Sequence, residues 1–169
     1  MGISSYPDAA PVESLTVPAA TRNRLPLWGR WSLFWTLFVG LGAVLGWALM
    51  WFVPGGAGLD ATLPYMQRLP LADVLFTSLF WPGLFLLIIN GATQLAAAGL
   101  IWRRHRLAPV ATLVCGVILL GWVGVEFAIF SLGDQAFSAN PADIVYTVFG
   151  LAEATMAVLW LRHQQQRSA

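Results

Sequence analysis

Two acidic and two amide side chains stand inside long apolar stretches of this 169-residue chain. The acids are Glu126 and Glu153, and the amides are Asn90 and Gln94. A charged side chain near the centre of a bilayer costs at least about 2.5 kcal/mol on insertion scales, so it should face other helices and find partners there. Asn90 and Gln94 are one helical turn apart and should therefore lie on one face of a helix.

The rise of a helix, about 1.5 Å per residue, predicts that these side chains form two layers across the membrane. The central layer combines both amides with one acid: Asn90, Gln94 and Glu153. The second layer, about 10 Å nearer the outer surface, combines the other acid with aromatic residues: Glu126, Tyr146 and Trp47. Trp122 shares a helical face with Glu126 because the two are four residues apart.

Two interpretations of these layers stay open. In the first, protonated, neutral carboxyls hydrogen-bond to an amide or a phenol and fix the order of the helices. In the second, the polar residues line a binding cavity or a proton route that opens to the outside, as intramembrane acids often do. The combination of acids and aromatic rings suits a cation or a quinone-like ring equally well. The candidate ligands are therefore a quinone or a lipid, and no cofactor motif is evident.

Sequence motifs for other chemistries are missing. His105 and His163 flank the apolar stretches instead of lying inside them, so paired axial ligation of a haem is not expected. The single cysteine, Cys115, allows neither an intrachain disulfide nor a C-x-x-C pair. The acids are not in metal-ligand spacing, and the chain has no phosphate loop, nucleophile elbow or H-E-x-x-H motif. These absences favour a non-enzymatic protein.

Four apolar segments must position the polar residues. The chain is 58% hydrophobic and only 10% charged, whereas soluble domains carry about 25% charged residues. A helix needs about 20 apolar residues to cross a bilayer, and residues 30–53, 74–102, 108–131 and 142–161 meet that length. We therefore predict an all-α, polytopic integral membrane protein with a four-helix transmembrane bundle. Residues 1–29 should form a mobile tail, residues 30–162 the bundle, and residues 163–169 a second tail.

The arginines predict the orientation of this bundle. Eight of the nine arginines fall on one side of the predicted spans, and only Arg68 lies in a loop on the other. Because basic residues accumulate on the cytoplasmic side, both termini should be cytoplasmic, in a bacterial cytoplasmic (inner) membrane. A cluster follows the second span: Arg103, Arg104 and Arg106. We interpret this cluster chiefly as a topology signal, although it could also attract anionic lipid headgroups.

Three segments carry a resemblance to a known group of proteins. They read NGATQLAA at residues 90–97, WRRHRLAP at 102–109 and GWVGVE at 121–126. The pattern resembles the small four-helix bacterial membrane proteins called DoxX-like, many of them uncharacterised, over residues 30–162. The resemblance implies the four-helix architecture, and it implies a membrane redox setting because DoxX itself is associated with a thiosulfate–quinone oxidoreductase. This chain has no redox motif, so the resemblance does not extend to that oxidoreductase activity.

These observations lead to one expected function and two alternatives. We expect an accessory or assembly subunit, for example of a respiratory or other energy-converting complex, that contacts the bilayer and other membrane subunits or itself. No basic block is long enough to predict nucleic-acid binding. One alternative is a proton-coupled carrier of small solutes that uses Glu126 and Glu153, and with only four helices it would need a dimer. The other is a quinone-interacting subunit, which predicts an apolar cavity beside Glu126, Trp122 and Tyr146.

Overall fold

The regular elements of the chain are helices throughout the part that the structure, a computed structural model, describes: residues 25–69, 71–131 and 141–168. The first half contains a long helix followed by short ones: α1 (Leu27–Phe52), the 3-10 segment η2 (Pro54–Thr62), α2 (Leu63–Met66), α3 (Ala72–Leu75) and α4 (Phe80–Phe85). The π-helical segment η3 and three α-helices follow: η3 (Leu86–Ala92), α5 (Thr93–Trp102), α6 (Ala108–Ser131) and α7 (Pro141–Ser168).

Four helical stretches are long and apolar enough to cross a membrane, as predicted. They are Leu27–Phe52, Phe80–Trp102, Ala108–Ile129 and Ile144–Gln166. The chain is therefore a multi-pass membrane protein whose helices contact lipid. Each stretch suits a span because a helix in hydrocarbon satisfies all of its backbone hydrogen bonds internally.

Three predicted boundaries differ from the structure. The first helix begins at Leu27, so the last residues of the predicted N-terminal tail are helical, while residues 1–24 lie outside the described part. The second span begins at Phe80 instead of residue 74, because α3 is a separate short helix that ends before a bend. The indole of Trp51 donates a hydrogen bond to the Phe80 carbonyl at 3.1 Å, which holds the new helix start against α1. The last helix continues through the predicted C-terminal tail to Ser168.

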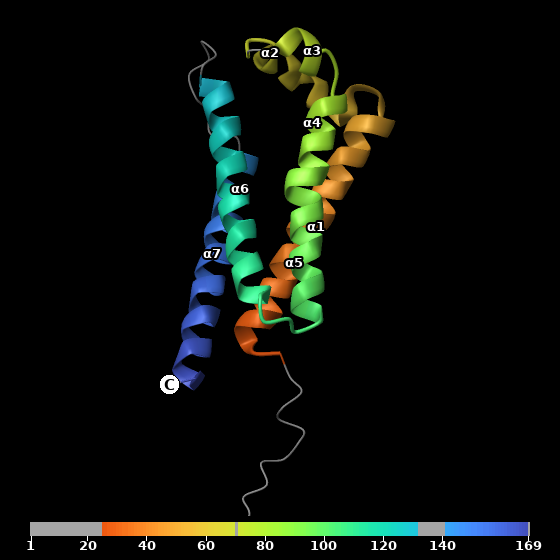
Figure 1. Cartoon of the computed structure of the whole chain (residues 1–169). Coiled ribbons are helices and arrows are strands. Elements are labelled where there is room, and N and C mark those ends of the chain that lie inside the picture. The colour runs from red at the N-terminus through yellow and green to blue at the C-terminus, as the bar shows by residue number, and fades with distance from the viewer. Residues whose placement is uncertain (1–24, 70, 132–140, 169) are drawn as a thin grey trace, which may run out of the picture.

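The helices are arranged as two diverging pairs (Figure 1). α6 packs along α7, while α1 packs against the consecutive elements α4, η3 and α5. The pairs meet at the end that carries the α5–α6 connection and the end of α7, which we call the arginine end because it holds Arg103, Arg104 and Arg106. They separate toward the opposite end, where η2, α2 and α3 lie, which we call the loop end. Both described ends of the chain lie at the arginine end.

Two glycines bring α6 and α7 into close contact. A Cβ atom added at Gly116 would lie 2.8 Å from the backbone nitrogen of Ala154. One added at Gly150 would lie 2.8 Å from the Leu120 side chain. Small residues allow such approach in membranes, where van der Waals packing drives helix association. The space beside Gly150 is thus filled by α6.

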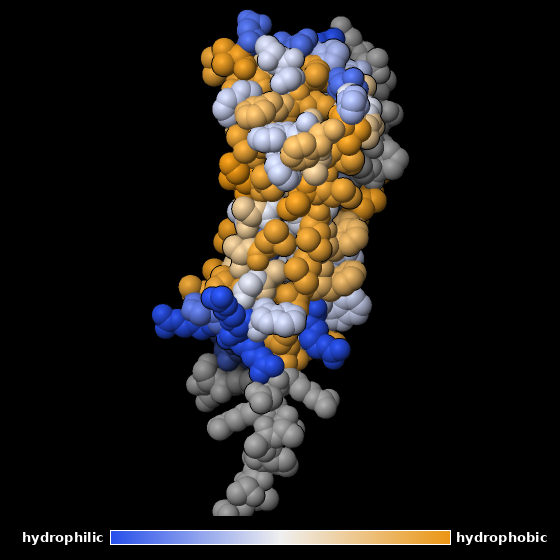
Figure 2. All heavy atoms as spheres, turned by 90° about the vertical axis from the view of Figure 1, so that its right-hand side faces the viewer, coloured by the Kyte–Doolittle hydropathy of each residue, from blue (hydrophilic) through white to orange (hydrophobic). Residues whose placement is uncertain are grey.

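The molecular surface agrees with a lipid environment. Large apolar side chains remain exposed along the helices, for example Phe34, Leu41, Leu45, Val117 and Leu151. Figure 2 shows a mostly apolar face above a strongly hydrophilic belt at the arginine end. Arg103, Arg104 and Arg106 are all exposed there. Lipid-facing apolar side chains need no protein partner, so this surface follows directly from the sequence.

The loop end is folded across the end of α1. Residues 55–58 all have positive φ, a backbone conformation that three glycines of this stretch adopt readily. Gly56 is buried, and a Cβ atom there would collide with the side chain of Leu79. The tight turn therefore docks η2 onto the helices instead of leaving it as a free loop.

Candidate functional site

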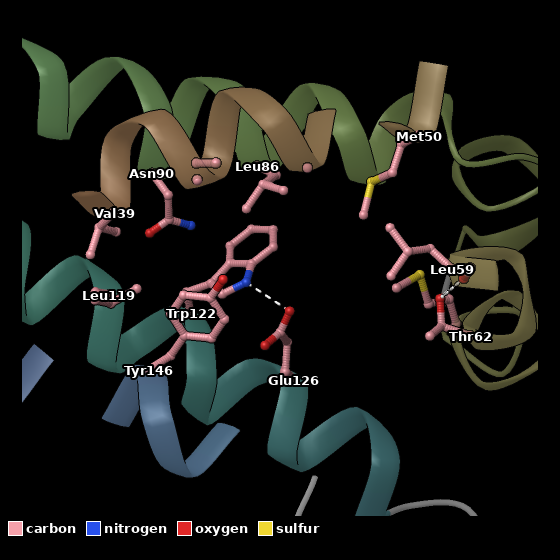
Figure 3. A pocket seen from close by; sticks show the side chains of 14 residues that line it. Val39, Met50, Leu59, Thr62, Leu86, Asn90, Leu119, Trp122, Glu126 and Tyr146 are labelled. Carbon is pink, nitrogen blue, oxygen red and sulfur yellow. Dashed lines mark hydrogen bonds between the residues drawn. The ribbon is translucent and has the colours of Figure 1, made fainter. Parts of the chain in front are cut away.

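A cavity of about 320 Å³ lies between the two helix pairs, toward the loop end. α1 and η3 form one wall, α6 and α7 form the other, and η2 and α2 lie at the loop end (Figure 3). The lining is mainly apolar, with a few polar side chains, as in most small-molecule sites. The lining residues are Val39, Gly42, Ala43, Gly46, Met50, Leu59, Thr62, Met66, Leu86, Asn90, Leu119, Trp122, Glu126 and Tyr146.

Asn90 is the polar residue of the first wall, and the π-helical segment η3 presents it. Its side chain is only 2% exposed, and neither the amide nitrogen nor the amide oxygen has a hydrogen-bond partner in the protein. Figure 3 shows Asn90 reaching into the cavity opposite Trp122. Buried amides are normally paired, so an unpaired donor and acceptor facing a cavity mark a place where a ligand can bind. π-helical turns inside α-helices occur frequently at functional sites.

The opposite wall holds an indole, a carboxyl and a phenol. The Trp122 indole nitrogen donates a hydrogen bond to Oε1 of Glu126 at 2.8 Å (Figure 3). The two residues are four apart on α6, so the bond bridges one helical turn and holds both side chains toward the cavity. Tyr146 reaches the same cavity from α7. The wall therefore offers aromatic faces beside groups that can form hydrogen bonds.

A second polar group lies outside the cavity lining. The Gln94 amide donates a hydrogen bond to Oε2 of Glu153 at 2.9 Å, and both side chains are almost completely buried. Gly40 of α1 faces this pair: a Cβ atom there would be 3.1 Å from the Gln94 Cβ atom. The Cys115 thiol donates a weak hydrogen bond to the Thr93 carbonyl at 3.5 Å close by. This group joins α5, α6 and α7, and the remaining acceptor atoms of the pair, Oε1 of Gln94 and Oε1 of Glu153, are buried without a hydrogen-bond partner.

The predicted layers are therefore rearranged. Gln94 and Glu153 pair as expected, but Asn90 faces the cavity and joins the group of Trp122, Glu126 and Tyr146. Asn90 lies in the π-helical segment η3 and Gln94 lies in α5, whereas the prediction assumed one regular α-helix through both residues. Trp47 is not among the lining residues, and its ring packs against Trp51 at a centroid distance of 5.3 Å.

Several lining residues carried no chemical signal in the sequence. Leu59, Thr62 and Met66 belong to the loop end, whose sequence predicts a loop that either lies against the membrane surface or caps the bundle. Gly42 and Gly46 form a G-x-x-x-G pair, which predicts helix packing, yet both line the cavity. The apolar residues within that loop were the one available sign that it caps the bundle.

The chemistry within reach of this cavity is binding through hydrogen bonds and aromatic contacts. Among the described residues, no three histidines, cysteines or acids are grouped to hold a metal ion. No protein-family model matches the chain, and neither a curated protein nor a solved structure matches it significantly. Inference about function therefore depends on the geometry of the cavity.

Proposed function

We propose that this protein is a non-enzymatic subunit of the bacterial cytoplasmic membrane that binds a small quinone-like ring in its interhelical cavity. Both chain ends would be cytoplasmic, and the loop end would face outward. The subunit would serve a larger respiratory or other energy-converting membrane complex. The observation that carries the proposal is the buried Asn90 amide, which faces the cavity without a partner in the protein.

The energetic cost of this amide supports a binding role. A buried donor or acceptor without a partner costs about 1–3 kcal/mol, and Asn90 contributes one of each. A ring oxygen that accepts from the amide nitrogen would recover part of that cost. Leucine is close to asparagine in size and would fill the same place without the penalty. An asparagine at this position is therefore better suited to recognising a ligand than to filling space.

The size and lining of the cavity suit a flat ring. Its volume of about 320 Å³ lies at the lower end of the range for small-molecule sites. Leu86, Leu119 and Ala43 provide apolar contact, and Trp122 provides an aromatic face. A quinone carries oxygens on opposite edges of its ring, so one could reach Asn90 while the other faced the wall of Glu126. Membership of the DoxX-like group, which the segments at residues 90–97, 102–109 and 121–126 led us to expect, would imply the same membrane redox setting.

The alternative of a proton-coupled carrier has less support from the geometry. In that mechanism both intramembrane carboxyls serve one solute and proton route, so they are expected to share a cavity. Glu126 lines the cavity, whereas Glu153 is 0% exposed, is absent from the lining and is bonded to Gln94. The two carboxyls therefore belong to different groups of residues.

Ligand binding can be tested with a decyl-substituted benzoquinone and the full-length protein in lipid nanodiscs. The quinone should quench tryptophan fluorescence saturably, and Trp122→Phe should remove a large part of that quenching because the ring would lie beside this indole. Asn90→Leu should weaken binding by about tenfold or more, as expected for losing a buried hydrogen bond. Ile88→Leu, at an exposed position of the same π-helical segment, is the matched control and should bind like the wild type.

Two results would contradict this assignment. Quenching that rises linearly with quinone concentration would show partition into lipid without a site. Equal saturable binding by the wild type and Asn90→Leu would show that the ligand binds elsewhere.

The subunit part of the proposal has its own test. Purification from its host membrane in a mild detergent should yield other membrane proteins in fixed stoichiometry. A homogeneous particle that contains this chain alone would count against an accessory role and would leave the ligand site as a property of the isolated protein.

A further inference from the structure

The cavity is open on one side, at Gly42 of α1. Gly42 lines the cavity and is also exposed, and a Cβ atom added there would meet no heavy atom within 4 Å. The other small lining residues of α1 differ in this respect. Ala43 is 6% exposed, and a Cβ atom at Gly46 would lie 2.8 Å from the Leu86 side chain. Gly42 thus marks a break in the α1 wall.

Aromatic contacts define where this break lies. Phe38 of α1 meets Phe149 of α7 edge-to-face, with the ring centroids 5.5 Å apart, and this contact closes the seam between the two helices. Gly42 is one turn farther along α1, and Tyr146 is one turn back along α7, so both lie on the loop-end side of that contact. Both residues line the cavity, and the seam between them has no side chain from Gly42 to close it.

Lipid surrounds this position. Gly42 is 15 residues from the start of α1, or about 22 Å along a helix about 39 Å long, which is well inside the span. Its neighbours Leu41 and Leu45 are 57% and 61% exposed, as is usual for side chains that contact acyl chains. Val145, beside Tyr146 on α7, is also exposed. An opening at this depth leads into hydrocarbon.

We propose that the gap between Gly42 and Tyr146 is a lateral portal through which a bilayer-dissolved amphiphile enters the cavity. This inference rests on the proposed ligand site and specifies its ligand class: a molecule with a polar ring and an apolar tail. The ring reaches Asn90 and the wall of Trp122 and Glu126, while the tail stays between α1 and α7 among the acyl chains. η2 and α2 cover the loop end of the cavity, so the membrane is the direct route.

The test compares the decyl-substituted benzoquinone with the same ring lacking its tail, in nanodiscs, by stopped-flow tryptophan quenching. Gly42→Leu should slow association of the tailed quinone by about tenfold or more, because the leucine side chain would occupy the gap. The tailless ring passes the same gap and should also associate more slowly, but its equilibrium affinity should fall much less than that of the tailed quinone, because no chain has to remain in the portal. Gly99→Leu and Gly121→Leu make the same change at exposed helical glycines that also have open space, and both should behave like the wild type.

A second variant widens the portal instead of blocking it, and it tests the proposal even if Gly42→Leu does not fold. Tyr146→Ala widens the proposed portal at a side chain that is 39% exposed. Association of the tailed quinone should then be faster, with a smaller change for the tailless ring.

Three outcomes would overturn the portal. Unchanged association rates in both portal variants would show that the ligand uses another route. Equal losses of equilibrium affinity for the two quinones in Gly42→Leu would show that no tail occupies the gap and that the leucine only fills the cavity. Equal effects at the control glycines would show a general change in the bilayer. Asn90→Leu, measured in parallel, separates a failure of the portal from a failure of the ligand site. If Asn90→Leu loses quinone binding while the portal variants behave like the wild type, the ligand site is supported and only the portal is wrong. If Asn90→Leu binds the quinone as the wild type does, the ligand site itself is wrong.

Discussion

At the scale of single residues, the interior contains two amides with opposite roles. Gln94 is bonded to Glu153 and has Gly40 of α1 against it, so it joins helices. Asn90 has no partner in the protein and faces the cavity. Because hydrogen bonding decides whether a buried amide is tolerated, replacing the two amides should have opposite effects on stability.

Gln94→Leu should lower the free energy of unfolding by about 1–3 kcal/mol, since it leaves the Glu153 carboxyl buried without its donor. Glu153→Gln should cost much less, because an amide oxygen can still accept the bond. Titration with SDS in mixed micelles measures both. Wild-type stability in Gln94→Leu would show that the pair is not structural.

Asn90→Leu should instead leave the ligand-free protein as stable as the wild type or raise its unfolding free energy by about 1 kcal/mol, since it removes two unpaired polar atoms. The same SDS titration applies, with Ile88→Leu as the reference. A marked loss of stability would indicate that Asn90 has a structural partner, and it would weaken the ligand-site interpretation.

At the scale of elements, the seam between α6 and α7 is the tightest contact, and it is the fixed wall of the cavity. Its closeness depends on Gly116 and Gly150, whose hydrogens face backbone or side-chain atoms of the other helix. Other glycines of α6, such as Gly121, face open space. The contribution of a glycine in α6 to stability therefore depends on whether it faces α7 or open space.

Gly116→Ala should destabilise the protein by about 1–3 kcal/mol, because the added methyl group would push α7 away from α6. Gly121→Ala adds the same methyl group on the open face, and it should be neutral or stabilising by up to about 1 kcal/mol through helix propensity. Thermal unfolding in detergent, followed by circular dichroism, compares them. Equal stability of the two variants would contradict the packing described here.

At the scale of the whole molecule, charged side chains lie at the ends of the helices and apolar side chains cover the surface between the ends. The arginine end is hydrophilic, and the helical surface between the ends is largely apolar. The described acids at the loop end are Asp60 and Asp73, both exposed. Under the positive-inside rule, the exposed arginines at one end support the orientation that we propose.

Orientation can be measured by cysteine labelling in a Cys115→Ser background, where serine keeps a hydrogen-bond donor. A cysteine introduced as Asp60→Cys should react with a membrane-impermeant maleimide in intact cells. One introduced as His105→Cys, at the arginine end, should react only after the membrane is permeabilised. The reverse pattern would invert the orientation, and labelling of both sites in intact cells would refute the two-sided topology.

The amino-acid sequence was sufficient to predict a lipid environment and four membrane-spanning helices, and the structure has four helices that could span a membrane. The length of each apolar segment and the positions of the arginines are local properties of the sequence. They therefore predict four membrane helices without knowledge of how the helices pack. It also predicted that Gln94 and Glu153 share a level, because helical rise is regular.

Three features could not be predicted from the sequence. Asn90 lines the cavity, Trp122 donates a hydrogen bond to Glu126, and the Trp47 ring packs against Trp51 outside the cavity lining. These outcomes depend on a π-helical turn, on the divergence of two helix pairs and on the rotation of each helix about its axis. Such quantities are set by contacts between segments distant in the chain, such as Gly116 with Ala154 or Gly56 with Leu79. Local patterns of hydrophobicity do not contain them, because lipid solvates every apolar face of a membrane helix equally well.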